Sequence, residues 1–134
     1  MRNALILLVI CLGVTITSCT VSSDRDNHKD MLIEGDFQFI QIYADINKQN
    51  SSTNTIREKQ TIEQIIDRIN NSKSESAEGM AYEKGPEGLL ILKGPDEFTT
   101  KVPFFKDSGD VLYSDYLIHS TLQDILPTSI PIEE

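Results

Sequence analysis

The sequence predicts an α+β fold, in which a small antiparallel sheet (a meander) carries one amphipathic helix packed on one of its faces. Three observations predict it. An isoleucine-rich segment has the period of a helix, several short segments have strand composition, and Gly-Pro turn sequences separate two of the predicted strands from their neighbours. We expect a leader at residues 1–18, a new N-terminus and flexible tether at 19–33, a single globular domain at 34–126 and a loose tail at 127–134.

The first predicted strand is Phe37–Tyr43, which is rich in aromatic and β-branched residues. Because side chains alternate along a strand, the aromatic residues fall on one face, and Ile40 and Ile42 fall on the other. Apolar character on both faces predicts a strand in the middle of the fold. The polar residues 47–54 then form a loop.

The clearest helix runs from Thr61 to about Asn70. Four isoleucines at positions i, i+3, i+4 and i+7 form one apolar stripe, Ile62, Ile65, Ile66 and Ile69. Thr61 and Gln64 have the spacing of a capping box at the helix start, and Asn70-Asn71-Ser72 favours its end. A stripe of this kind usually packs on the sheet of its own domain, so we expect that arrangement here.

After a linker rich in Ser and Glu, residues 80–105 are predicted to form the meander. Its strands are Met80–Lys84, Leu89–Leu92 and Phe98–Phe105. Lys84–Glu87 and Lys93–Asp96 each contain Gly-Pro and predict hairpin turns. Pro103 has no N–H group, so we expect it on an edge strand or at a strand end.

The C-terminal part is predicted to begin with a turn at Lys106–Asp110. A last strand or strand pair follows at Val111–Tyr113 and Tyr116–Ile118. Thr121–Leu126 then forms one helical turn, which Pro127 ends because proline cannot continue a helix.

Residues 1–18 have the organisation of an export signal. Arg2 is the one charge before an uncharged apolar run, Ala4–Val14. This run is shorter than the roughly 20 residues that a transmembrane helix needs, so it suits the core of a signal peptide. Thr17 and Ser18 are small, as residues at a signal-peptidase site are. Cleavage after Ser18 leaves a chain of 116 residues.

The end of this leader, Ile16-Thr17-Ser18-Cys19, resembles the bacterial lipobox, in which an aliphatic residue and two small residues precede an invariant cysteine. The resemblance implies cleavage between Ser18 and Cys19, and a diacylglyceryl group, with acyl chains such as palmitate, on the Cys19 thiol. The chain would then be held by lipid on the extracytoplasmic face of the cell membrane, because two acyl chains anchor a protein far better than one. The alternative is an ordinary secretory signal with an unrelated cysteine.

The chain that remains after cleavage is acidic and has one cysteine. It has 11 basic and 21 acidic residues, for a formal charge of −10 with histidine neutral. This balance argues against nucleic acid, whose phosphates require clustered Lys and Arg, and favours a basic protein partner. Cys11 is lost with the leader, so Cys19 has no partner for an intramolecular disulfide.

The sequence predicts no catalytic residue, cofactor site or metal site. It has no nucleophile elbow, zinc-binding helix, phosphate-binding loop or dinucleotide fingerprint. His119 and Ser120 are adjacent, but neighbours on a strand point to opposite faces. The aspartates near Gly109 lack the spacing of a calcium loop, and nothing in the tether would hold His28 beside its neighbouring aspartates.

Two segments, Ile62–Asn71 and Val111–Ile118, are similar in style to small lipoproteins of Bacillus-type Gram-positive bacteria, over a span of about residues 37–118. Some such lipoproteins are encoded on integrative conjugative elements and act in exclusion, by blocking the mating machinery of a second, identical element. The resemblance implies a non-enzymatic surface lipoprotein that acts by contact with another envelope protein. The first alternative is an accessory or sensor lipoprotein of envelope stress or sporulation, which binds a small ligand or peptide along the sheet edge near Pro103; an enzyme comes last.

Overall fold

The computed structural model describes residues 32–50 and 52–127. Within these residues the chain forms one α-helix, α1 (Lys59–Asn71), seven strands and the 3-10 turn η2 (Leu122–Asp124). The strands are β1 (Phe39–Tyr43), β2 (Asn54–Ile56), β3 (Ser74–Ser76), β4 (Gly88–Lys93), β5 (Thr99–Phe104), β6 (Val111–Tyr113) and β7 (Tyr116–Ile118). The predicted leader, the lipobox-like segment with Cys19, His28 and residues 128–134 lie outside the described residues.

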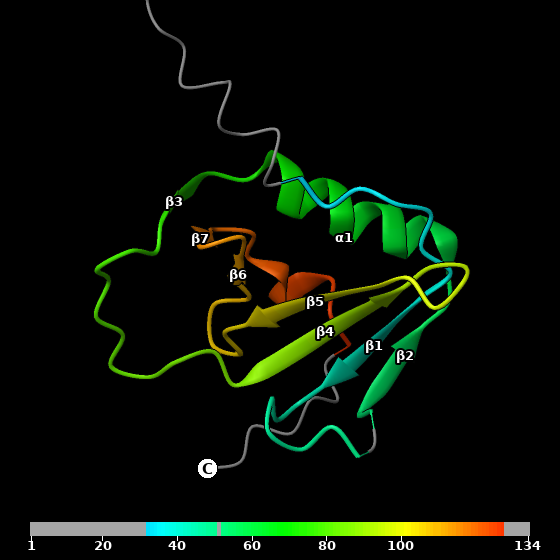
Figure 1. Ribbon diagram of the computed structural model, residues 1–134, viewed down its shortest axis with the longest axis horizontal. Helices are drawn as coiled ribbons and strands as arrows, with labels where there is room; N and C mark the ends of the chain where they lie inside the picture. The colour runs from blue at the N-terminus through cyan, green and yellow to red at the C-terminus, as the bar shows by residue number, and fades with distance from the viewer. Residues whose placement is uncertain (1–31, 51, 128–134) are drawn as a thin grey trace, which may run out of the picture.

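All seven strands belong to one antiparallel sheet with the order β2-β1-β4-β5-β6-β7-β3. α1 packs on one face of this sheet (Figure 1). The predicted α+β fold is therefore confirmed, and the isoleucine stripe explains it. Ile62, Ile65 and Ile69 are buried, and Ile66 packs at the margin of the same core.

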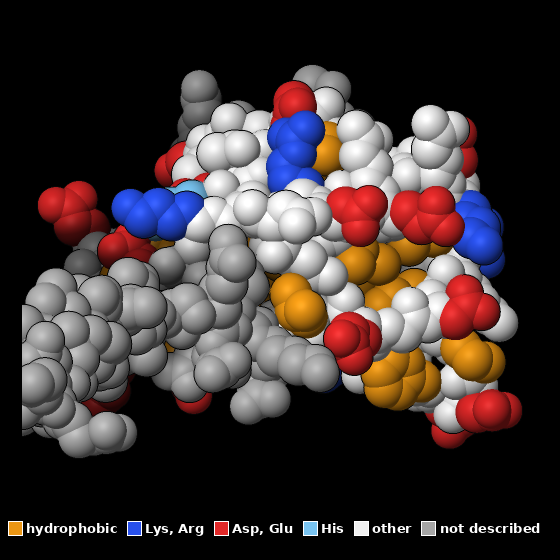
Figure 2. Space-filling view, turned by 90° about the horizontal axis from the view of Figure 1, so that it is seen from above, with side chains coloured by type: hydrophobic (Ala, Val, Ile, Leu, Met, Phe, Trp, Pro, Cys, Tyr) orange, Lys and Arg blue, Asp and Glu red, His pale blue; other side chains and the backbone are white. Residues whose placement is uncertain are grey.

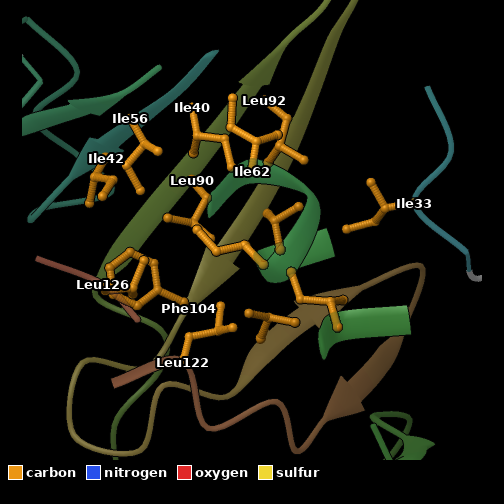
Figure 3. Close-up of a cluster of buried hydrophobic side chains, with 14 of the residues drawn as sticks. Ile33, Ile40, Ile42, Ile56, Ile62, Leu90, Leu92, Phe104, Leu122 and Leu126 are labelled. Atoms are coloured by element: carbon orange, nitrogen blue, oxygen red, sulfur yellow. The ribbon is translucent and has the colours of Figure 1, made fainter. Parts of the chain in front are cut away.

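The sheet contributes the other half of this core through side chains that alternate along its central strands (Figure 3). These inward-facing residues are Ile40, Ile42, Leu90, Leu92, Val102 and Phe104, and each is at most 1 % exposed. Tyr43, Leu89 and Ile91 form a second, smaller cluster that includes alternate residues of β1 and β4. The predicted apolar character of both faces of β1 is confirmed by Tyr43 on one face and by Ile40 and Ile42 on the other. The predicted place of Phe37 is wrong, because the strand begins at Phe39 and Phe37 packs in the main core with Ile40 and Ile42. Burial of each such aliphatic side chain stabilises the fold by about 1.5–3 kcal/mol.

The start of α1 differs from the prediction. The helix begins at Lys59 with Glu58 as its N-cap residue, so Thr61 lies inside the first turn and the predicted capping box is wrong. The Thr61 hydroxyl instead donates to Oε2 of Glu58 at 2.6 Å. Arg57 and Glu58 alone separate the end of β2 at Ile56 from the start of α1 at Lys59.

Two further predictions about the strands are wrong. Met80–Lys84 is not a strand, so Lys84–Glu87 is not a hairpin turn; the Tyr82 hydroxyl makes a local contact with Met80 Sδ at 3.2 Å. Ser74–Ser76, inside the predicted linker, forms β3 and pairs with β7. Residues 94–98 join β4 to β5, so the second predicted hairpin is confirmed, but its turn is Pro95–Phe98, two residues later than the predicted Lys93–Asp96.

The C-terminal elements follow the prediction, because β6 and β7 form a hairpin and η2 precedes Pro127. Pro103 is the last residue but one of β5, which agrees with a strand end, although β5 is not an edge strand. Ile33 corrects the predicted tether, because it is 2 % exposed and belongs to the core. Its backbone N–H donates to Asn70 Oδ1 at 2.8 Å, and its carbonyl accepts from Asn70 Nδ2 at 3.0 Å.

Candidate functional site

The most exposed large apolar side chain of the described residues is that of Phe98, which is 48 % exposed. It ends the loop between β4 and β5 and lies against Phe37, with the two ring centroids 5.8 Å apart. Gly35 and Gly94 allow this close approach, because an added Cβ on either would lie 3.0 Å from the Phe98 ring. We call residues 94–98 and the adjoining residues 34–37 the aromatic tip.

Four exposed carboxylates belong to the aromatic tip, those of Glu34, Asp36, Asp96 and Glu97. None of them forms an ion pair with a cation of the described residues. The nearby Lys93 ammonium donates instead to Thr99 Oγ1 at 3.1 Å. Figure 2, a view of the side that carries α1, shows hydrophobic side chains bordered by acidic ones. The tip is thus an exposed aromatic ring with four carboxylates around it that form no ion pair among the described residues.

The turn that carries Phe98 has an unusual backbone. Asp96 and Glu97 have φ values of 54° and 62°, and the Phe98 N–H donates to the Pro95 carbonyl at 3.0 Å. Positive φ at both central residues is the feature of a type I′ turn, which favours Asn-Gly. Residues other than glycine occupy this conformation at a cost in free energy. The two exposed carboxylates of Asp96 and Glu97 therefore lie on a strained turn.

The aromatic tip lies at the opposite end of α1 from the point where the described chain begins. Ile33 contacts Asn70 at the C-terminal end of α1, and the following residues run beside the helix towards the tip (Figure 1). A helix of 13 residues is about 20 Å long. Ile33 and the tip are therefore separated by about one helix length.

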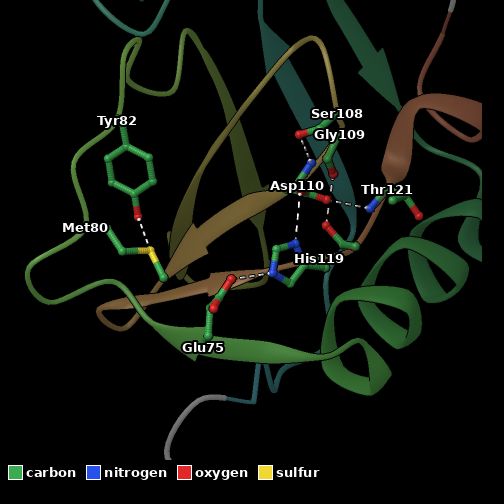
Figure 4. A network of polar contacts seen from close by, with 9 residues as sticks. Glu75, Met80, Tyr82, Ser108, Gly109, Asp110, His119 and Thr121 are labelled. Atoms are coloured by element: carbon green, nitrogen blue, oxygen red, sulfur yellow. Dashed lines mark hydrogen bonds and ion pairs between the residues drawn. The ribbon is translucent and has the colours of Figure 1, made fainter.

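A second polar cluster surrounds His119, which follows β7 (Figure 4). The Nε2 atom lies 2.7 Å from Oε1 of Glu75 on β3, and Nδ1 lies 3.4 Å from Oδ2 of Asp110. The hydrogen bond that the ring donates to the Glu75 carboxylate, with a smaller contribution from Asp110, raises the pKa of His119 above its usual value. We call Glu75, His119 and Asp110 the His119 clamp.

His119 and Ser120 are not arranged as a catalytic base and nucleophile. Ser120 is fully buried, and its hydroxyl donates to the Gly109 carbonyl at 2.9 Å, whereas the imidazole contacts the two carboxylates of the clamp. This agrees with the expectation that adjacent side chains do not meet.

Two open depressions on the described surface are lined largely by polar and charged groups. The first, of about 370 Å³, is lined by residues 44–47, 84–87, 106 and 107. The second, of about 430 Å³, lies between residues 76–78 and residues 114–116. The aspartates near Gly109 are dispersed, because Asp107 and Asp115 line different depressions and Asp110 contacts His119. In the described ranges no group of three or more His, Cys, Asp or Glu side chains is placed to hold a metal ion.

Sequence reasoning did not find the aromatic tip or the His119 clamp, and its own site residues, Ile16 to Cys19, lie outside the described residues. The one available signal for the tip was the Asp-Glu pair beside the predicted Gly-Pro turn. Within residues 32–50 and 52–127, no helix has the length and hydrophobicity to cross a membrane. In comparisons with known proteins, no family model, curated protein or solved structure matched this chain.

Proposed function

We propose that this chain is a lipid-anchored surface lipoprotein that acts by contact with another envelope protein, without a chemical step of its own. The lipobox-like Ile16-Thr17-Ser18-Cys19 supports the anchor on Cys19. The exposed Phe98 ring among four unpaired carboxylates is the observation that carries the contact, and the aromatic tip is the surface that makes it.

The chemistry of the aromatic tip defines the partner. Aromatic side chains that enter a pocket contribute a large share of the binding energy at protein interfaces. Carboxylates at the rim steer a positively charged partner and accelerate association, with a smaller effect on final affinity. The partner therefore has an apolar pocket for Phe98, bordered by Lys or Arg side chains that face Asp96 and Glu97.

Exclusion is the specific form of this function that we propose. In that form, the partner belongs to the mating machinery of a conjugative element identical to the one that encodes this chain. The similarity of Ile62–Asn71 and Val111–Ile118 to small lipoproteins of Bacillus-type bacteria supports it. The position of the tip also supports it, because a tether that enters beside Asn70 leaves the far end of α1 free to meet an incoming machine.

The experiment is a mating assay in which recipient cells express the full chain or a variant. We expect the natural chain to reduce uptake of one specific element, and Phe98→Ala to abolish most of that reduction at equal surface abundance. Tyr82→Ala is the matched control, because Tyr82 is also an exposed aromatic residue, at 37 %, but lies outside the tip. A Phe98→Ala chain that excludes as well as the natural chain would refute the role of the tip.

The anchor is tested separately by intact-mass analysis of the membrane fraction. We expect a species that begins at Cys19 and carries a diacylglyceryl mass, and we expect it to be absent with Cys19→Ala. A natural chain that is cut, unacylated and released into the medium would instead indicate an ordinary secretory signal.

The alternative is an accessory or sensor lipoprotein that binds a small ligand or peptide. The depression lined by Asp45, Lys84, Glu87 and Lys106 favours this function, because it offers charges of both signs near the end of β5 that contains Pro103. A rise in melting temperature with a small zwitterionic molecule, lost in Lys106→Ala, would support it. The same result with no effect of Phe98→Ala in mating would replace the exclusion proposal.

A further inference from the structure

The edge strand β3 is attached to the sheet weakly. It has three residues, Ser74–Ser76, and none of them is buried. Its strand partner in the described sheet is β7 alone. Two backbone hydrogen bonds extend this pairing, from the Ala77 N–H to the Asp115 carbonyl at 2.9 Å and from the His119 N–H to the Lys73 carbonyl at 2.9 Å. A short polar edge strand of this kind opens at low free-energy cost.

The side-chain link between β3 and the rest of the sheet passes through His119. Asp110 is held firmly, because its Oδ1 accepts the Thr121 N–H at 3.2 Å and its backbone N–H donates to Ser108 Oγ at 3.2 Å. Glu75 projects from β3 and reaches the imidazole from the other side. Glu75 and Asp110 are the charged groups of the described residues that act on this ring. Lys73 contacts His119 through the backbone, where its carbonyl accepts the His119 N–H.

We propose that the His119 clamp is a proton-operated latch on β3: the imidazolium joins Glu75 to Asp110 and keeps β3 on β7, and deprotonation opens this join. The charged ring has two N–H donors, one for each carboxylate, whereas the neutral ring has one. With a single donor, one carboxylate loses its hydrogen bond and faces a ring lone pair. β3 is then no longer connected through side chains to the loop that contains Asp110.

Opening of the latch changes the surface around β3. Residues 76–78, at the end of β3 and beyond it, form one wall of the second depression, and residues 114–116 form the other. Departure of β3 removes that wall and uncovers the backbone edge of β7, Tyr116–Ile118. An uncovered strand edge is a template for pairing with another extended segment. Protonation of His119 therefore controls whether this edge is available.

The direction of the pH response follows from the pKa of His119, which is raised by its two carboxylate partners. The latch is fully closed below the usual histidine pKa of about 6.5. It opens as the pH rises through the higher pKa of the folded chain.

The test is amide hydrogen exchange of the full chain at pH 6 and pH 9, corrected for the intrinsic exchange rate at each pH. We expect the protection factors of the Ala77 and His119 amides to fall roughly threefold to fivefold at pH 9, the effect that an exposed ion pair supports. Amides in the β4–β5 ladder serve as an internal reference and should keep their protection. Equal corrected protection of Ala77 at both pH values would overturn the proposal.

Two variants assign the response to the clamp. His119→Gln stays neutral at every pH, so its Ala77 amide should have low protection at pH 6 and no further loss at pH 9. His28→Gln removes the other histidine of the chain and should leave the pH response intact. Glu75→Gln keeps the shape of the residue without its charge, and it should respond like His119→Gln. If either clamp variant keeps the natural pH response while its β4–β5 amides remain protected, the latch does not exist.

Discussion

Two hairpins of the sheet, β4–β5 and β6–β7, have the same turn geometry but are stabilised by different interactions. Asp96 and Glu97 join β4 to β5, and Ser114 and Asp115 join β6 to β7; all four residues have positive φ. The β4–β5 hairpin has six paired positions, and buried side chains from both of its strands lie in the core. The β6–β7 hairpin has three paired positions.

The difference lies in whether the charged side chains near each hairpin take part in contacts within the described fold. Around the short hairpin, Asp110 and Glu75 bind His119, and Ser120 binds Gly109, so side chains supplement a short backbone ladder. The long hairpin is held by its ladder and its core residues. Its tip can therefore carry carboxylates without ion pairs and an exposed Phe98 at little cost to the fold.

The largest expected effect comes from Phe104, the residue of β5 through which the two hairpins are paired. Phe104 pairs with Gly88 and with Val111, and its side chain is 1 % exposed. Phe104→Ala should lower the free energy of unfolding by about 3–5 kcal/mol, because it leaves a cavity in the core. Urea denaturation measures the change. Phe105→Ala, at the half-buried neighbour, should cost less than about half as much; equal losses would contradict the shared-core interpretation.

Glycine substitutions next to the two hairpins should differ in how much they lower the stability of the fold. In Gly109→Ala, the new Cβ would lie 2.4 Å from the Leu122 backbone nitrogen, and φ at this residue is 72°. We expect a loss of about 1–3 kcal/mol in the free energy of unfolding, because backbone atoms must move. Gly94→Ala places its Cβ 3.0 Å from Asp36 O and from the Phe98 ring, so a smaller loss is expected. Thermal denaturation of both variants measures the two losses. A larger loss in Gly94→Ala than in Gly109→Ala would show that the tip is the more constrained region.

The clamp should give the short hairpin a pH-dependent share of stability that the long hairpin lacks. His119 has a raised pKa, so its contribution is complete below pH about 6.5 and disappears as pH rises through the folded-state pKa. The natural chain should exceed His119→Gln in stability by no more than about 1 kcal/mol at pH 6, because the pair is partly exposed. Melting curves from pH 6 to 9 should converge for the two chains; a constant gap would point to packing instead of charge.

Relief of backbone strain should give the smallest effect and should divide the hairpins by function. Asp96→Asn with Glu97→Gly supplies the residues that a type I′ turn favours and should stabilise the chain by about 1 kcal/mol. Ser114→Asn with Asp115→Gly should stabilise it similarly. In the mating assay, the first pair should weaken exclusion, because two carboxylates of the tip are lost, whereas the second should not. Loss of exclusion with both pairs would show that charge at the tip is not the determinant.

The sequence predicted the elements whose own side chains determine them. α1 and β4 have strong apolar patterns, and their burial follows from those patterns alone. β2 and β3 have three residues each and contain a single apolar side chain, Ile56, between them. They are strands because β1 and β7 lie beside them. Met80–Lys84 has strand composition but no such neighbour. Pairing with a distant segment decided each of these cases, and no local pattern contains that information.

The same limit applies to the candidate sites. His119 meets Glu75, which is 44 positions away, only because β3 returns to pair with β7. Strand alternation puts Phe98 on the inward face with Val102 and Phe104, but the chain has already left the strand at the turn, so its ring is exposed. The predicted lipobox, Ile16–Cys19, is the opposite case, since it is a contiguous pattern that is proposed from the sequence without any fold.

The two hydrogen bonds between Ile33 and Asn70 determine where mechanical force enters the domain. A pull along the N-terminal segment, such as a membrane anchor would transmit, acts first on these two bonds and on the buried Ile33 side chain. We expect the pulling force to act next on the C-terminal end of α1, whose isoleucines pack in the core. β1 and the aromatic tip lie beyond this junction, so we expect such a pull to reach the tip only after the contacts with Asn70 break.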